Sequence, residues 1–239
     1  MRIDILTIFP SLINSFVKES LIGRAQERGT LEIVAHDLRE GASGTHKAVD
    51  DTPFGGGPGM VLKPEPIFNV VEKKNPPRPL LLLSPAGETF THSKAKELSK
   101  LDGFTLICGR YEGVDQRVQD HLIDGEISLG DFILAGGEIA ALAIIETVTR
   151  LVPGVMGNEE SAESESFAEG LLEYPQYTRP WDFKGITPPD VLRSGNHEEI
   201  ELWRKARALE MTLSNRPDLI EKRGGLTDDE QSLLIRKFK

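Results

Sequence analysis

Short apolar runs alternate with helical patterns over residues 1–151. The apolar runs predict strands at Ile3–Phe9, Leu31–His36, Leu80–Leu83, Phe104–Cys108 and Glu126–Ser128. Helical spacing between them predicts helices over about residues 10–28, 64–73, 93–100, 114–121 and 137–151. The third and fourth strands are apolar without alternation, which is typical of strands covered on both faces. This order predicts an α/β fold, with a mostly parallel sheet and helices on both faces.

The helix predicted over residues 137–151 is apolar on every side. Ile139–Ile145 carries no charge, and the nearest charged residues are Glu138, Glu146 and Arg150. A helix without a polar face must be buried all round. We favour a second copy of the chain as the cover, which predicts a homodimer, and the alternative is a central helix within a monomer.

The pattern changes after Pro153. Residues 153–170 are small and acidic and predict a flexible linker. Further on, Leu202, Trp203, Ala206 and Leu209 share one helical face, and this periodicity predicts a small all-α domain. The cations within Trp203–Arg207 lie on the same helix and are either a solvated face or an RNA contact.

Composition narrows the class of protein. The 239 residues are 38% hydrophobic, enough for one large or two modest domains, and no apolar run approaches the roughly 20 residues that span a bilayer. The single cysteine, Cys108, suits a reducing compartment, so we expect a cytoplasmic protein without a membrane partner. No histidine pair has metal-ligand spacing, and we expect no metal site. The net charge of −10 argues against nucleic-acid binding, but residues 173–239 carry 12 basic and 12 acidic residues, so this part is neutral.

Two glycine-punctuated segments, Cys108–Gly113 and Ser128–Glu138, follow predicted strands. The carboxyl ends of parallel strands are where an open α/β sheet holds its ligand. Phe132–Leu134 forms an apolar wall suited to a flat heterocycle. Backbone groups can approach a ligand closely at three glycines, Gly130, Gly136 and Gly137. These features predict a pocket that reads a base by backbone hydrogen bonds.

A third glycine-rich segment, Gly55–Gly59, resembles a phosphate-binding loop only in part. It lacks the Gly-Lys-Ser/Thr ending, and Pro58 has no N–H to donate. It is either a mobile surface loop or a functional lid, and the polar residues just before it, His46, Asp50 and Asp51, favour the lid.

Nine motifs in order give the chain a resemblance to a known family over almost its whole length. They are Ile8–Pro10, Val49–Met60, Leu83–Pro85, Cys108–Gly113, Gly130-Asp131 with Gly136–Glu138, Pro153–Val155, Ser166–Gly170, Tyr177–Pro180 and Leu192–His197. With them the chain closely resembles the bacterial tRNA (guanine-N1)-methyltransferases, the TrmD family of the SPOUT superfamily.

The resemblance implies an architecture, a cofactor and partners. The α/β fold would contain a C-terminal trefoil knot, although threaded chains are rare in general. Residues 1–156 would be the SPOUT methyltransferase domain, 157–172 an acidic linker carrying the base, and 173–239 a helical tRNA-binding domain. The methyl donor would be S-adenosylmethionine, and a divalent-ion requirement stays open. The enzyme would be a homodimer with its active sites at the subunit interface.

The reaction implied is methylation of N1 of the guanosine immediately 3′ of the anticodon. This N1 carries a proton, so transfer needs a base, and a cation must offset the charge that grows on O6. By matching position, Glu165 is the general base and Arg150 the cation. The family usually has aspartate at the base position, and the neighbouring Glu163 or Glu169 is an alternative base in this chain.

The resemblance also assigns binding residues. The target guanine would be contacted by Glu112, and Arg110 and Asp50 would also bind the substrate. The cofactor would be contacted by Leu83, Ser84, Pro85, Gly109, Tyr111, Leu129, Gly130, Asp131, Phe132, Ile133, Leu134, Gly136 and Gly137. Two other functions stay open: a knotted methyltransferase acting on another base or on a ribose 2′-OH, and an RNA-binding module that retains the fold without activity.

Overall fold

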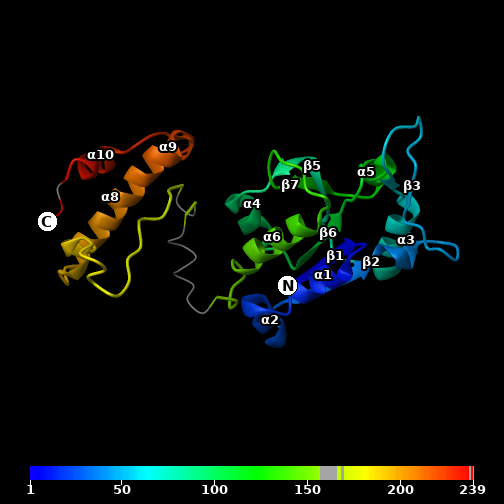
Figure 1. Ribbon diagram of the computed structural model, residues 1–239, viewed down its shortest axis with the longest axis horizontal. Coiled ribbons are helices and arrows are strands. Elements are labelled where there is room, and N and C mark those ends of the chain that lie inside the picture. Colours follow the sequence, from blue (N-terminus) through cyan, green and yellow to red (C-terminus); the bar gives the residue numbers. More distant parts are fainter. Residues whose placement is uncertain (157–165, 168–169, 237, 239) are drawn as a thin grey trace. The chain divides into compact units, whose positions relative to one another are not determined.

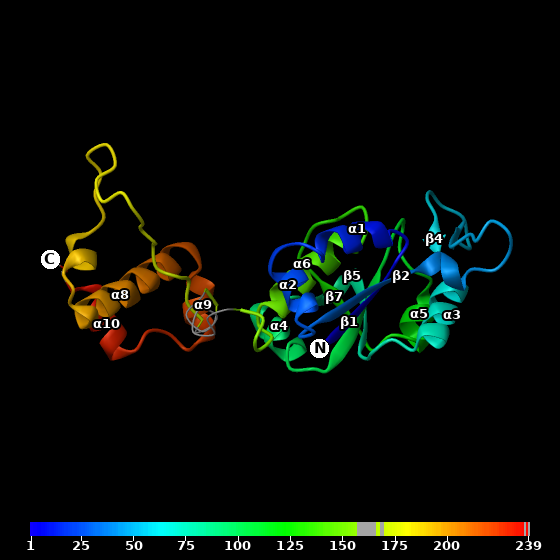
Figure 2. The ribbon, with the colours of Figure 1, turned by 90° about the horizontal axis from the view of Figure 1, so that it is seen from below.

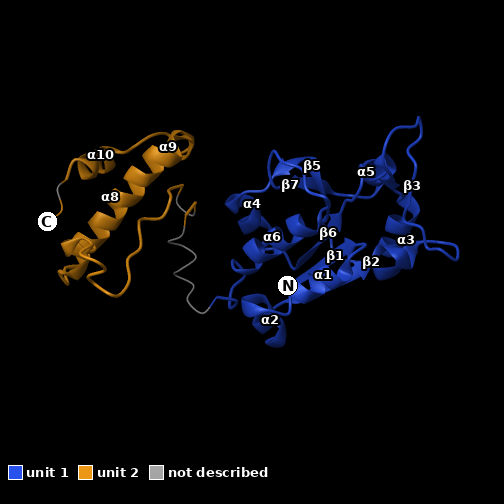
Figure 3. Ribbon diagram, in the orientation of Figure 1, with its two compact units in different colours: residues 1–157 blue, residues 158–239 orange. Residues whose placement is uncertain are grey.

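The computed structural model describes residues 1–156, 166–167, 170–236 and 238. The chain forms two compact units, Met1–Gly157 and Asn158–Lys239 (Figure 3). The candidate base Glu165 and its alternatives, Glu163 and Glu169, lie outside the described residues. The roles expected for residues 1–156, 157–172 and 173–239, as methyltransferase domain, linker and tRNA-binding domain, stay predictions.

Five parallel strands form the sheet of the first unit, in the order β2-β1-β6-β5-β7 (Figure 1). Their bounds are β1 Arg2–Thr7, β2 Glu32–Asp37, β5 Leu80–Thr89, β6 Gly103–Cys108 and β7 Gly125–Ser128. The five predicted strands and the α/β class are confirmed. The central strand is β6, where Leu106 lies opposite Ile5 on one side and Leu81 on the other.

Helices cover both faces of this sheet (Figures 1 and 2). They are α1 Pro10–Phe16, α2 Ser20–Glu27, α3 Pro64–Lys74, α4 His92–Leu98, α5 Gln116–His121 and α6 Glu138–Thr149. Leu81 and Leu83 of β5 pack in one cluster with α1, α4 and α6, whereas Leu80 and Leu82 pack in another with α3 and α5. Successive side chains of a strand point to opposite faces, so one unbroken apolar run supplies both cores, as predicted.

The single helix predicted over residues 10–28 is two helices in the structure. The first, α1, ends at Phe16, and α2 begins at Ser20, whose φ of 55° lies outside the right-handed helical range. The turn is tight, because a Cβ on Gly23 would lie 2.7 Å from the carbonyl carbon of Lys18. The apolar spacing continues through this turn, which is why the sequence pattern did not reveal it.

The strand β5 is longer than predicted and contains a bulge. It pairs with β7 over Leu81–Leu83 and again at Glu88 and Thr89, so residues 84–87 are inserted between the two pairings. The chain returns to β7 closely, since a Cβ on Gly87 would lie 2.6 Å from the carbonyl carbon of Ile127. The inserted residues therefore stand out at the carboxyl edge of the sheet.

The glycine-rich loop is closed by a short antiparallel ribbon, which the sequence pattern did not predict. Its strands are β3, Asp50–Asp51, and β4, Val61–Leu62. Four glycines between them, Gly55, Gly56, Gly57 and Gly59, have positive φ angles. Two-residue strands carry too little periodicity to be recognised in a sequence.

Helices follow Pro189 in the described part of the second unit, whereas residues 171–189 have no helix. Its helices are the 3₁₀ helix η2 Asp190–Arg193, α8 His197–Asn215, α9 Pro217–Lys222 and α10 Asp228–Leu234. Ala206 and Leu209 of α8 pack with Ile220 and Leu233 in its core, and Trp203 is also buried. The turn before α10 is held by a capping box between Thr227 and Glu230.

The apolar helix α6 is only partly covered within one chain. Its inner face, including Ala141, Ile144 and Ile145, is buried against the sheet, whereas Ile139 is 54% exposed. Within one chain the helix is therefore not buried all round, which contradicts the alternative of a central helix within a monomer. The homodimer that we favour as its cover stays a prediction. No helix in the described ranges is both long and apolar enough to cross a membrane. The trefoil knot stays a prediction.

Candidate functional site

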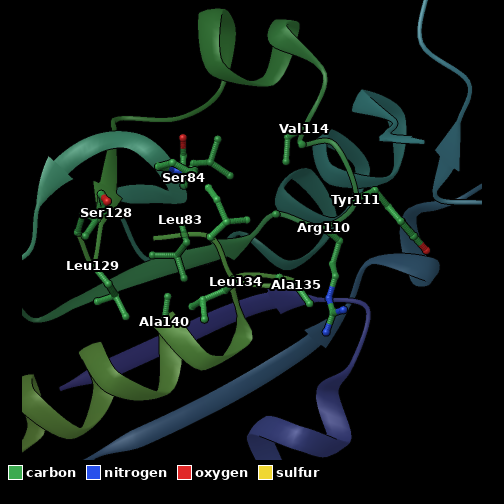
Figure 4. A pocket seen from close by; sticks show the side chains of 18 of the residues that line it. Leu83, Ser84, Arg110, Tyr111, Val114, Ser128, Leu129, Leu134, Ala135 and Ala140 are labelled. Atoms are coloured by element: carbon green, nitrogen blue, oxygen red, sulfur yellow. The ribbon is translucent and has the colours of Figure 1, made fainter. Parts of the chain in front are cut away.

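A pocket lies at the carboxyl ends of three neighbouring strands, β6, β5 and β7 (Figure 4). Its volume is about 630 Å³, which is in the range of small-molecule sites. Leu83, Leu129, Leu134 and Ala140 converge on its apolar side, and Arg110 and Tyr111 lie at the opposite end (Figure 4). This is the edge at which open parallel sheets bind ligands.

Most of the residues that we expected to contact a ligand line this pocket. Asp131 and Asp50 do not, and neither does Arg150. Glu165 lies outside the described residues. The expected residues that do line it are Leu83, Ser84, Pro85, Gly109, Arg110, Tyr111, Glu112, Leu129, Gly130, Phe132, Ile133, Leu134, Gly136 and Gly137.

Backbone pairing joins the two glycine-punctuated loops. The N–H of Gly137 donates to the carbonyl oxygen of Gly109 at 2.9 Å, and Arg110 forms an antiparallel bridge with Gly136. The two segments lie so close that a Cβ on Gly137 would be 2.8 Å from the Cα of Cys108. Gly137 is therefore required by the packing of backbone on backbone.

Gly136 leaves room for an ion pair between Arg110 and Glu138. A Cβ at this position would lie 2.6 Å from Glu138 Oε2 and would overlap the Arg110 side chain. From the sequence alone, this glycine is expected to let a ligand approach the backbone closely. The structure supplies a different reason, because side chains of the protein itself fill the space.

Glu138 is a buried carboxylate at the start of α6, with 1% of its surface exposed. Thr7 Oγ1 donates to Glu138 Oε1 at 2.8 Å, and Arg110 Nε donates to Oε2 at 3.1 Å. The Arg110 Cζ lies 4.6 Å from the centroid of the Phe9 ring. A buried charge needs such partners, because an unpaired one is strongly unfavourable. The sequence does not mark Glu138 as a site residue; its one signal is a charge directly after two glycines.

Cys108 is the last residue of β6 and is buried. Burial raises the pKa of its thiol well above the usual value, the negative charge of Glu138 raises it further, and Arg110 opposes the effect. The thiol is therefore neutral at physiological pH and packs as a small apolar group.

The glycine-rich loop meets the rim of the pocket at Glu112. The N–H of Glu112 donates to the carbonyl oxygen of Met60 at 2.9 Å, and a Cβ on Gly59 would lie 2.9 Å from Glu112 Cδ. Leu62 donates to the carbonyl oxygen of Gly113 at 2.9 Å. These contacts connect the glycine-rich loop to the pocket. The sequence alone leaves two interpretations of this loop, a mobile surface loop or a functional lid. Asp50 pairs with Leu62 in the same ribbon but stays outside the pocket.

The site and the fold together define a class. This is an α/β protein whose pocket lies at the carboxyl edge of a parallel sheet. Its glycine loops lack the sequence of a phosphate-binding loop.

Comparison with known proteins then identifies the family. The protein-family model described as "tRNA (Guanine-1)-methyltransferase TrmD" matches residues 1–222 of this chain. A Halalkalibacterium halodurans protein named tRNA (guanine-N(1)-)-methyltransferase is 51% identical over 243 residues, 99% of this chain and 98% of that protein. A protein with the same name from Citrifermentans bemidjiense is 51% identical, over 92% of this chain and 90% of that protein. Another from Staphylococcus aureus is 49% identical, over 99% of this chain and 97% of that protein. The chain belongs to the TrmD family of tRNA (guanine-1)-methyltransferases.

Proposed function

We propose that this protein transfers the methyl group of S-adenosylmethionine to N1 of the guanosine immediately 3′ of the anticodon in tRNA. Its membership of the tRNA (guanine-1)-methyltransferase family supports the enzyme class. The observation that carries the proposal is the pocket of about 630 Å³ at the carboxyl edge of β5, β6 and β7.

The loop after β7 suits the adenosine part of the cofactor. Ile133, Leu134 and Ala135 line the pocket, and within the described chain their backbone N–H groups donate to no other backbone group. The apolar side chains Leu83, Leu129 and Leu134 would contact a flat ring. Backbone donors beside an apolar wall fit a purine, whose edge accepts hydrogen bonds.

The reaction requires two charged groups besides the pocket. Bound S-adenosylmethionine supplies an electrophilic methyl group on a sulfonium centre. A carboxylate, which we assign to Glu165, would accept the N1 proton of guanine as N1 forms its bond to the methyl carbon. The bond between that carbon and the sulfonium sulfur would break, and its electron pair would stay on sulfur as a neutral thioether. A cation, which we assign to Arg150, stabilises the negative charge that N1 deprotonation places on O6.

The exposed apolar surface supports a homodimer. Ile139 of α6 and Leu12 and Phe16 of α1 are exposed large hydrophobic residues, and these two helices pack against each other. Phe132 and Ile133 in the pocket loop are also exposed. Exposed large apolar side chains on helices that pack together are typical of an interaction site. A second copy that covers it would lie directly beside the pocket.

The second unit offers aromatic and cationic groups for RNA. Arg193 lies over the ring of Trp181 and Arg204 over that of Tyr174, each with its Cζ 5.0 Å from the ring centroid. Phe183 is exposed, and Lys184 lies beside its ring. Such groups stack on unpaired bases and contact phosphates, which supports tRNA as the partner of this unit.

Methylation of an unmodified tRNA transcript tests the proposal. We expect 1-methylguanosine after nucleoside analysis, formed only with S-adenosylmethionine, and none from a transcript with adenosine 3′ of the anticodon. A methyl group on another base or on a ribose 2′-OH would instead indicate a different RNA methyltransferase. Binding of tRNA without any methyl transfer would indicate a non-enzymatic module.

A further inference from the structure

The polar end of the pocket is built around Arg110. Among the described residues that line the pocket it is the single lysine or arginine. Its Nε is held by Glu138, and Phe9 lies against its face. No ligand is needed for this arrangement, because every contact comes from the protein.

The partners of Arg110 are themselves fixed. Glu138 is buried and also accepts a hydrogen bond from Thr7 at the end of β1. The Thr7 hydroxyl in turn accepts from the N–H of Phe9 at 2.9 Å, the residue whose ring lies against Arg110. Three segments of the chain, after β1, after β6 and at the start of α6, thus meet at one guanidinium.

This arrangement leaves one edge of the guanidinium available. The Arg110 guanidinium has five N–H groups, and the only hydrogen bond that this side chain donates within the described residues uses Nε. The N–H groups on its two Nη atoms remain. An arginine fork held in one orientation matches two oxygens of a phosphate or a carboxylate. Because the side chain is already ordered, little conformational entropy is lost on binding.

We propose that Arg110 is an anion site at the rim of the pocket and that Glu138 is the residue that positions it. The ligand is a group with two anionic oxygens, either a phosphodiester of the tRNA or the carboxylate of the cofactor's methionine part. The inference rests on the proposed function for these two ligands. The role of Glu138 does not, because it follows from hydrogen bonds within the protein.

The competing explanation is that the ion pair serves folding alone. Glu138 would then be a stabilising acid at the N-terminus of a helix, and Arg110 only its counter-ion. Both explanations predict that Glu138→Gln lowers stability. They differ in what happens to ligand affinity when both residues are changed, because only a positioned Arg110 couples the two substitutions in binding.

The test is a double-mutant cycle of Arg110→Lys and Glu138→Gln, measured by binding. Arg110→Lys keeps the charge and removes the fork. Three probes are used: S-adenosylmethionine, 5′-methylthioadenosine, which lacks the amino-acid carboxylate, and an unmodified tRNA transcript. If the wild-type chain binds neither S-adenosylmethionine nor tRNA, the proposed function has failed, and this failure is distinct from that of the anion site.

Each source of the anion gives its own result. For a phosphodiester, both single substitutions raise the Kd for tRNA by about 10- to 100-fold and leave the two small molecules unchanged. For the carboxylate, the Kd for S-adenosylmethionine rises by a similar factor, and the values for 5′-methylthioadenosine and tRNA do not. In both cases the Kd of the double variant for the affected probe is no higher than that of the single variant that binds more weakly. Unchanged affinity for all three probes in Arg110→Lys, or fully additive losses, would overturn the proposal.

Two further variants serve as a control and as a replacement for Glu138→Gln. Arg117→Lys is the matched control, because Arg117 is an exposed arginine outside the pocket lining and pairs with Asp115. Its affinities should match the wild type. If Glu138→Gln does not fold, Thr7→Val takes its place in the cycle, since it removes the hydroxyl that donates to Glu138 and accepts from the N–H of Phe9.

Discussion

Glu138 and Arg150 lie at opposite ends of α6, the first as its first residue and the second directly after its last. At about 1.5 Å per residue, the helix separates their backbones by about 18 Å. Glu138 belongs to the pocket end, so Arg150 lies far from the pocket of its own chain. If Arg150 acts on the guanine, it does so in a pocket contributed by the partner subunit.

Mixing two inactive variants tests such a shared site. Gly136→Val would displace the Arg110–Glu138 pair and damage the pocket, and Arg150→Ala would remove the cation. In a hybrid dimer, one site would collect both defects and the other neither. Random exchange makes about half of the dimers hybrid, so we expect about a quarter of wild-type activity. Subunit exchange is verified by mass spectrometry of tagged chains, and exchange without recovered activity would place the whole site within one chain.

Glu165→Gln should lower the rate of methyl transfer by about 10²- to 10⁴-fold, the usual effect of a positioned base. Affinity for S-adenosylmethionine should stay close to that of the wild type, because the amide keeps the size of the side chain. Single-turnover kinetics are the appropriate measurement, since product release can limit steady-state turnover. Glu163→Gln and Glu169→Gln are the matched controls. A wild-type rate in Glu165→Gln together with a loss in one control would move the base to that residue.

Gly137→Ala should destabilise the first unit by about 1–3 kcal/mol, because its Cβ would press on the backbone of Cys108. Gly109→Ala is the comparison, since its nearest neighbour, the carbonyl oxygen of Leu83, would lie 3.4 Å away, an ordinary contact. Hydrogen exchange of the β6 amides measures the effect within the first unit. Equal protection in the two variants would show that the backbone at Gly137 can relax.

Asp4 should give the first unit an acid-sensitive contribution to stability. Its carboxylate is fully buried and accepts from His36 Nε2 and Arg2 Nε, each at 2.7 Å. Burial alone would raise the pKa of Asp4, but these hydrogen bonds outweigh it and hold the pKa below its ordinary value. A lowered pKa in the folded state stabilises the fold above the unfolded-state pKa, near 4, and this contribution is lost as the pH falls further.

The matching variant is Asp4→Asn, which breaks a buried ion pair and should cost about 3–5 kcal/mol at neutral pH. Its difference from the wild type should shrink below about pH 4, as the wild-type carboxyl is protonated. Asp218→Asn is the control. A hydrogen bond from Arg216 lowers the pKa of Asp218 to about 2, but this pair is exposed, and solvent screens it. A pH-independent difference for Asp4→Asn would contradict the expectation.

The sequence predicted the sheet because its strands are unbroken apolar runs, and Leu80–Leu83 indicated by itself that both faces are covered. It did not predict the turn at Ser20, where the backbone leaves the helical range while the apolar spacing continues. It also placed the pocket loops correctly beside each other but missed the ion pair of Arg110 and Glu138. These residues are 28 positions apart, and local patterns carry no information on such a contact.

Both tryptophans of the chain, Trp181 and Trp203, belong to the second unit, whereas the pocket belongs to the first. Tryptophan emission therefore reports the second unit alone, and Tyr111 is the one tyrosine of the first. The unit that contains the pocket has no tryptophan, so a small molecule bound there contacts no indole ring of that unit. A change in tryptophan emission on addition of S-adenosylmethionine would thus be an optical signal of communication between separate parts of the protein.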